Sequence, residues 1–77
     1  MQVAYLLYER FTALDLTGPH EVLNSVPGVE SVFVAERRGP VRNETDTLSL
    51  VADRSLEEVD RPDVLVVPGG YGTRALL

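Results

Sequence analysis

The sequence predicts an α/β fold with a doubly wound parallel sheet. The predicted elements are those of the N-terminal part of such a domain, so we expect the sheet to be incomplete. Apolar runs without polar alternation, at residues 3–8 and 64–67, are typical of strands that are buried on both faces of a parallel sheet. Helical segments separate these runs, and this alternation is the order of a doubly wound domain. The 77 residues contain no repeat, linker or low-complexity tract, so we expect at most one small domain.

The first half of the chain predicts two strands joined by an interrupted helix. In chain order these elements are expected at residues 3–8, 12–26 and 29–36. Thr12 and Asp15 have the spacing of a capping box, with Asp in place of the usual Glu. Gly18 and Pro19 should break or kink the helical segment, because proline suits the first turn of a new helix.

The second half of the chain predicts short strands around one short helix. The expected elements are an edge strand at residues 41–43, a strand at 48–52, a helix at 55–59, a buried strand at 64–67 and the first turn of a helix at 73–77. Ser55 and Glu58 form a cleaner capping box at the start of the short helix. A turn of Pro68, Gly69 and Gly70 follows the last strand.

Composition excludes several classes of function. The net charge of −5 comes from twelve acidic residues against seven arginines, without the basic stripe that nucleic-acid binding requires. The absence of cysteine excludes disulfides and thiolate metal sites, and no other cluster of metal ligands stands out. The glycines form neither a dinucleotide fingerprint nor a P-loop, so we expect no cofactor and no metal.

The chain carries no sequence signal for a membrane or for export. No apolar stretch approaches the ~20 residues that a helix needs to cross a bilayer. The first residues lack the charged region and the long apolar run of a signal peptide. We therefore expect a cytoplasmic chain that makes no contact with a membrane.

The candidate functional residues follow two strands at their carboxyl ends. Asp15 comes after the first strand, and Gly69 and Gly70 come after the last. In an open parallel sheet, ligands collect outside these ends, and glycine lets backbone N–H groups approach a developing oxyanion. Two plainer interpretations stay open, because the glycines also suit a tight turn without a ligand and Asp15 also suits a helix start that faces solvent.

The other candidates for chemistry are weaker. His20 is the only histidine and lies beside Glu21 at a helix start with no third partner, so we expect a surface or helix-end position and not a catalytic base. No serine has the G-x-S-x-G context of a nucleophile. The tyrosines are expected to be packing residues: Tyr5, Tyr8 and Tyr71.

Three segments resemble the ThiJ/PfpI family of the class I glutamine amidotransferase-like superfamily. They are FTALDLTGPHEVL at residues 11–23, GPV at 39–41 and PDVLVVPGGYGTRALL at 62–77. The most similar subgroup is that of isonitrile hydratase, and the LDL-x-GP-x-EV signature also occurs in the sensor domains of AraC-type transcription regulators. The resemblance runs nearly end to end but covers only the N-terminal part of the family domain.

This resemblance implies a flavodoxin-like fold, usually homodimeric, whose chemistry uses a cysteine on a strained strand-to-helix elbow. Asp15 matches the family's acidic residue, which contacts that cysteine. Gly69 and Gly70 match the turn whose backbone N–H groups help to form the oxyanion pocket. No residue matches the nucleophile, so we expect residues 1–77 to be a partial domain that stops before the elbow.

The resemblance leaves three functional hypotheses. The first is a fragment of an isonitrile hydratase-like enzyme, inactive alone, whose intact domain converts a small isonitrile to an N-formamide. The second is a fragment of the ligand-sensing domain of an AraC-type regulator, which has no catalytic activity. The third is an interaction fragment, a homodimer or a chain whose sheet a partner completes, because an open sheet edge favours association.

Overall fold

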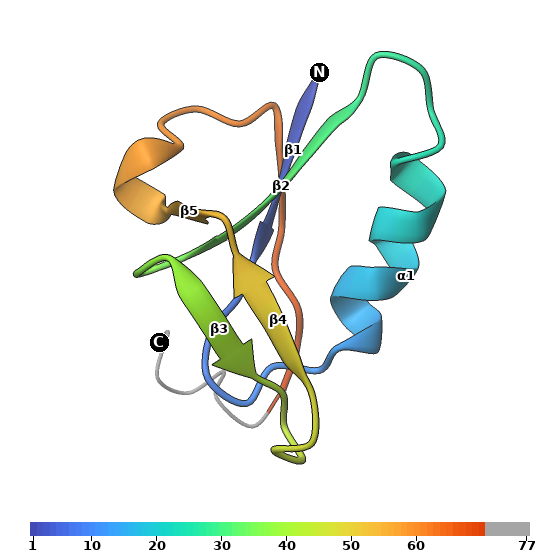
Figure 1. Cartoon of the computed structure of the whole chain (residues 1–77). Coiled ribbons are helices and arrows are strands. Elements are labelled where there is room, and N and C mark those ends of the chain that lie inside the picture. The colour runs from blue at the N-terminus through green and yellow to red at the C-terminus, as the bar shows by residue number, and fades with distance from the viewer. Residues whose placement is uncertain (71–77) are drawn as a thin grey trace.

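The computed structural model describes residues 1–70, which form a parallel sheet, a helix on one face of it and a hairpin (Figure 1). The four-stranded sheet has the order β5–β2–β1–β6, and all its strand pairs are parallel. Its strands are β1 (Gln2–Leu6), β2 (Glu30–Ala35), β5 (Arg54–Ser55) and β6 (Val64–Val66). The predicted α/β class and parallel sheet are confirmed, whereas the helix predicted at 73–77 lies outside the described residues.

The strand β1 is the interior strand on which the site is built. It pairs with β2 on one side and with β6 on the other, so that Tyr5 lies opposite both Phe33 and Val66. The side chains of Val3, Ala4 and Tyr5 have no exposed surface. An uninterrupted apolar run is what a strand with neighbours on both edges and cover on both faces requires, and the first run of the chain has that position.

The apolar core lies between the sheet, the helix α1 (Leu14–Leu23) and the hairpin of β3 (Gly39–Arg42) and β4 (Ser49–Ala52). Its buried residues are Val3, Tyr5, Leu7, Phe11, Leu16, Ala35, Val41 and Ala52. Burial of one large apolar side chain stabilises a fold by roughly 1.5–3 kcal/mol. The helix and the hairpin each contribute to this cluster, so the same core positions both of them against β1.

The helix α1 continues through Pro19, so the predicted break at Gly18 and Pro19 is wrong. Proline has no N–H group for the carbonyl of Asp15, which lies four residues earlier, and the helix loses that one bond. Leu16 is fully buried against the sheet and offsets this loss. Tertiary packing of an apolar residue commonly outweighs a local preference of this kind.

The two predicted capping boxes have different outcomes. The first is wrong, because the residue that precedes α1 is Ala13 and no side chain caps the helix. The second is confirmed in its position, since the carboxylate of Glu58 accepts the N–H of Ser55 at 2.9 Å, although the element is a single 3₁₀ turn, η1 (Leu56–Glu58). The two-residue strand β5, directly before η1, was not predicted.

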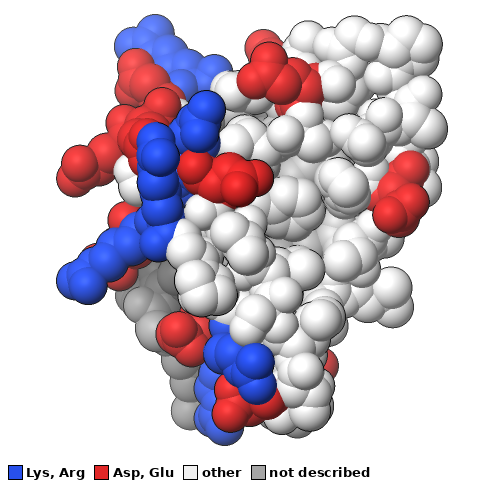
Figure 2. Space-filling view, viewed as in Figure 1, with Lys and Arg blue, Asp and Glu red and all other residues white. Residues whose placement is uncertain are grey.

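Charged side chains gather toward η1 and the turn between β2 and β3, while the surface over α1 is mostly uncharged in this view (Figure 2). Within the described part of the chain, no helix combines the length and the apolar character that crossing a membrane would require.

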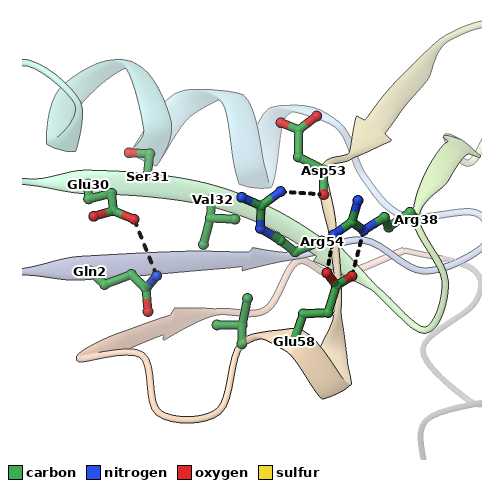
Figure 3. Close-up of a pocket in the computed structure, with 9 residues that line it drawn as sticks. Gln2, Glu30, Ser31, Val32, Arg38, Asp53, Arg54 and Glu58 are labelled. Atoms are coloured by element: carbon green, nitrogen blue, oxygen red, sulfur yellow. Dashed lines mark hydrogen bonds and ion pairs between the residues drawn. The ribbon is translucent and has the colours of Figure 1, made fainter.

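An exposed ion pair ties η1 to the turn after β2. The Nε group of Arg38 lies 2.6 Å from Oε1 of Glu58, and Nη2 bonds to Oε2, beside an open hollow lined by Gln2, Val32 and Arg54 (Figure 3). The hydrogen bond from Arg38, together with the N–H of Ser55, lowers the pKa of Glu58 from 4.5 to about 2. The carboxylate form is therefore the form that the fold favours.

We predict that acidification destabilises the native chain more than the Glu58→Gln variant. A carboxyl group whose pKa is lowered by folding contributes stability that is complete above its unfolded value of 4.5 and is lost as the pH falls toward 2. The effect is small because the pair is exposed, and salt at about 1 M should reduce it further. Thermal unfolding followed by circular dichroism on both sides of this window measures it, and an equal loss in both proteins would contradict the assignment.

Candidate functional site

The turn of Pro68, Gly69 and Gly70 lies against the loop that joins β1 to α1 and against the first turn of α1. Three hydrogen bonds connect them: the Tyr8 hydroxyl donates to the carbonyl oxygen of Pro68 (2.5 Å), the Thr12 N–H donates to the carbonyl oxygen of Gly69 (2.8 Å) and the Gly69 N–H donates to Oδ2 of Asp15 (2.9 Å). Because β1 and β6 are parallel neighbours, their carboxyl ends meet at one edge of the sheet. The sheet order thus brings together groups that lie 54 residues apart in the chain.

Asp15 lies in the first turn of α1, and its side chain is exposed. Its Oδ2 atom accepts the N–H of Gly69, and within residues 1–70 the carboxylate has no other hydrogen bond. A Cβ atom on Gly69 would lie 3.3 Å from the same oxygen, so a side chain there would press on the carboxylate. One oxygen of Asp15 therefore holds the turn, and the second has no hydrogen bond to any of residues 1–70.

Gly70 is the residue that the close approach of the two segments requires. Its φ is +144°, a region that side chains disfavour. A Cβ atom at this position would lie 2.4 Å from the carbonyl oxygen of Arg10 and 2.8 Å from the Cα of Phe11. Gly70 also forms an isolated antiparallel bridge with Phe11, so the backbones are in direct contact.

The hairpin supports the β1–α1 loop from its other side. The N–H of Arg10 donates to the carbonyl oxygen of Arg42 at 3.1 Å, and the N–H of Glu44 donates to that of Phe11 at 2.8 Å. The Thr12 hydroxyl bonds to Oε2 of Glu44 at 2.9 Å. The loop is therefore fixed between the hairpin and the glycine turn, and its backbone has hydrogen-bond partners on both sides.

The structure brings together the residues that the sequence singled out. Asp15 and Gly69 are bonded to each other, and Gly70 lies against the preceding loop, while their catalytic roles stay predictions. Tyr8 was expected only to pack, yet its hydroxyl bonds to the glycine turn. No sequence signal distinguishes it, because Tyr8 ends an apolar run and looks like one more strand residue.

His20 packs against aromatic rings and stays apart from the hydrogen bonds of the site. Its ring lies edge-on to Tyr5 and Phe33, with centroid distances of 5.5 and 5.2 Å. The side chain is half-buried in the last turn of α1 and has no hydrogen bond or ion pair within residues 1–70. The sequence placed His20 at a helix start, and this is wrong, because α1 begins at Leu14 and His20 lies in its last turn. The expected helix-end position holds for the other end of the helix, with the ring packed under the helix and not on the open surface.

An open hollow of about 870 Å³ adjoins the site at the carboxyl ends of β1 and β2. Leu6, Leu7 and Val41 give it an apolar lining, and Tyr8 lies between this hollow and the glycine turn. Such a surface suits the apolar part of a small molecule. Across residues 1–70, no three His, Asp or Glu side chains gather as the ligands of a metal ion would.

Comparison with known proteins identifies the family of this chain. A model of the DJ-1/PfpI family matches residues 1–76, which is almost the whole chain. The chain belongs to the DJ-1/PfpI family. The ThiJ/PfpI resemblance noted from residues 11–23, 39–41 and 62–77 is thereby confirmed.

Individual members of the DJ-1/PfpI family agree with this assignment. The chain is 38% identical to isonitrile hydratase of Pseudomonas putida over all 77 residues, and the match covers 33% of that protein. A ThiJ/PfpI family protein from Pseudomonas syringae superposes with a TM-score of 0.88 at 36% identity, over 96% of this chain and 31% of that one. The chain thus spans about a third of the length of these relatives.

A transcription regulator has the same fold over this segment. An AraC family transcriptional regulator from Pseudomonas putida superposes with a TM-score of 0.70 at 25% identity, over 90% of this chain and 40% of that protein. This segment is therefore similar in sequence to an isonitrile hydratase and in structure to a transcription regulator.

We predict that Gly70→Ala destabilises the fold by about 2 kcal/mol or more, because an unfavourable φ and a steric overlap with the loop act together. Gly39→Ala is the matched control, since Gly39 also has a positive φ (+126°) but has nothing within 4 Å of the new Cβ atom. Urea unfolding of both variants measures the difference. An equal loss of stability in the two would contradict the close approach at Gly70.

Proposed function

We propose that this chain provides the acid and the oxyanion turn of a DJ-1/PfpI domain that hydrates an isonitrile to an N-formamide. The observation that carries the proposal is the hydrogen bond between Asp15 and Gly69 at the carboxyl ends of β1 and β6. Asp15 is the proposed catalytic acid, and Gly69 and Gly70 are the proposed oxyanion turn. The similarity to isonitrile hydratase of Pseudomonas putida supports the reaction and the small-molecule substrate.

The chemistry requires a group that moves protons. Water adds across the isonitrile so that its oxygen and one hydrogen reach the terminal carbon, and the other hydrogen reaches the nitrogen. An exposed carboxylate that is held in place through one oxygen suits that exchange. The N–H of Gly69 holds the acid in place. A role of the turn in stabilising developing negative charge is part of the proposal and follows from the general use of backbone N–H groups for that purpose.

A covalent step needs a nucleophile from outside these residues, because the 77 residues contain no cysteine. We propose that polypeptide outside these 77 residues completes the sheet and supplies the nucleophile, and that the complete domain forms a homodimer or pairs with a partner chain. The strand β6 is the outermost strand on its side of the described sheet, and Leu65 and Val67 are 52% and 54% exposed. These apolar side chains support the idea that this side is covered in the complete domain.

A ligand-sensing role is the alternative function. The likeness to the AraC family regulator of Pseudomonas putida and the apolar hollow beside Tyr8 favour it. In that case the same turn binds a small molecule and no bond is made or broken. The acidic net charge of −5 is compatible with this role, because any DNA contacts would come from another domain.

We predict that the 77-residue chain alone hydrates an alkyl isonitrile no faster than buffer does. The 77 residues contain no cysteine and only part of the surrounding site, so no covalent step can begin. Formamide production followed by chromatography measures the rate, and turnover by the pure chain above background would overturn the prediction.

We predict that the chain becomes active when it replaces the matching third of Pseudomonas putida isonitrile hydratase in a chimera. Asp15→Asn in that chimera should lower kcat by about 10²–10⁴-fold, because the amide still accepts the Gly69 N–H but cannot transfer the proton. A folded chimera that binds an isonitrile without turnover would favour the sensing role. Full activity of the Asp15→Asn chimera would contradict the assignment of Asp15.

A further inference from the structure

The peptide unit between Pro68 and Gly69 is bound at both of its polar ends by side chains. Its carbonyl oxygen accepts the Tyr8 hydroxyl at 2.5 Å, and its N–H donates to Oδ2 of Asp15 at 2.9 Å. The C=O and N–H groups of a trans peptide point in opposite directions, and no peptide bond within residues 1–70 is cis. Tyr8 and Asp15 therefore approach this peptide from opposite sides and fix the rotation of its plane.

The two side chains reach the peptide from different elements. Tyr8 follows β1, is half-buried, and lies 60 residues from Pro68 in the chain. Asp15 belongs to the first turn of α1. Pro68 is itself buried and has no N–H group, so its carbonyl is the one backbone group through which the residue can be held.

The next peptide unit is fixed by the backbone alone. The carbonyl oxygen of Gly69 accepts the Thr12 N–H at 2.8 Å. Since this peptide is also trans, its N–H, which belongs to Gly70, is directed away from Thr12. The directions of both N–H groups in the turn are thus set by residues of the β1–α1 loop.

We propose that Tyr8 is a positioning residue of this site. Its hydroxyl sets the plane of the Pro68–Gly69 peptide and so keeps the Gly69 N–H directed at Asp15, which in turn fixes the carboxylate. In this role Tyr8 acts through the Pro68–Gly69 peptide. The catalytic meaning of this role rests on the proposed function, whereas the positioning is a property of the backbone and can be measured without turnover.

The chain offers a matched control for this inference in Tyr5. Both tyrosines are in the first ten residues, but the fully buried hydroxyl of Tyr5 has no hydrogen-bond partner in the described structure. Replacing either residue with Phe removes one oxygen atom and leaves the ring. Only the Tyr8→Phe variant removes a hydrogen bond to the turn, and Tyr5→Phe relieves an unsatisfied polar atom.

The test is nuclear magnetic resonance of the uniformly ¹⁵N-labelled 77-residue chain and of these two variants. In Tyr8→Phe we expect the amide resonances of Gly69 and Gly70 to shift. Hydrogen exchange at Gly69 should accelerate about five-fold, which is the factor that the loss of one ordinary hydrogen bond produces. The amides of β2 should be unchanged. In Tyr5→Phe, exchange at Gly69 should equal that of the native chain.

Two results would overturn the inference. Unchanged Gly69 resonances and exchange in Tyr8→Phe would show that the hydroxyl does not orient the peptide. A general loss of dispersed amides in Tyr8→Phe, with Tyr5→Phe still folded, would make the bond a requirement of the whole fold and not a local positioning contact. If the Tyr8→Phe variant behaves as expected but the chimera described above is inactive, the positioning role stands and the proposed function fails.

Discussion

The candidate site depends on one contact, that between the β1–α1 loop and the turn after β6. Parallel pairing of β1 with β6 brings the two segments to one edge of the sheet, but pairing alone leaves their distance open. The distance is set by Gly70, where any Cβ atom would overlap with the carbonyl oxygen of Arg10. Only with that approach can the carboxylate of Asp15 reach the N–H of Gly69.

Several hydrogen bonds hold the loop and the turn in this contact. The hairpin β3–β4 bonds to the loop through the backbone of Arg42 and through Glu44. The loop bonds to the turn through Tyr8 and Thr12, and the first turn of α1 bonds to it through Asp15. A single hydrogen bond contributes only about 0.5–1.5 kcal/mol. Several of these bonds orient the same two peptide units, Pro68–Gly69 and Gly69–Gly70. Together they fix the orientation of these peptides more than they add to stability, because each bond limits the rotation of a peptide that another bond also holds. A site of this kind is organised before any ligand arrives.

The sequence predicted the fold and the two ends of the site for physical reasons that can be named. Apolar runs are sufficient to find buried parallel strands, and glycine pairs after such a strand are sufficient to find a turn. The helix through Pro19 could not be predicted, because its continuity depends on the burial of Leu16 against strands that are distant in sequence. The role of Tyr8 depends on a backbone carbonyl 60 residues away, and no local pattern reports such a partner.

The central claim is that Asp15 accepts a hydrogen bond from the backbone N–H of Gly69. The most direct measurement is the scalar coupling across that hydrogen bond, between the amide nitrogen of Gly69 and the carboxyl carbon of Asp15, in the doubly labelled chain. The structure predicts a resolved coupling, which disappears in Asp15→Ala. A folded chain with dispersed β1 and β2 amides and no coupling between these two nuclei would contradict the claim.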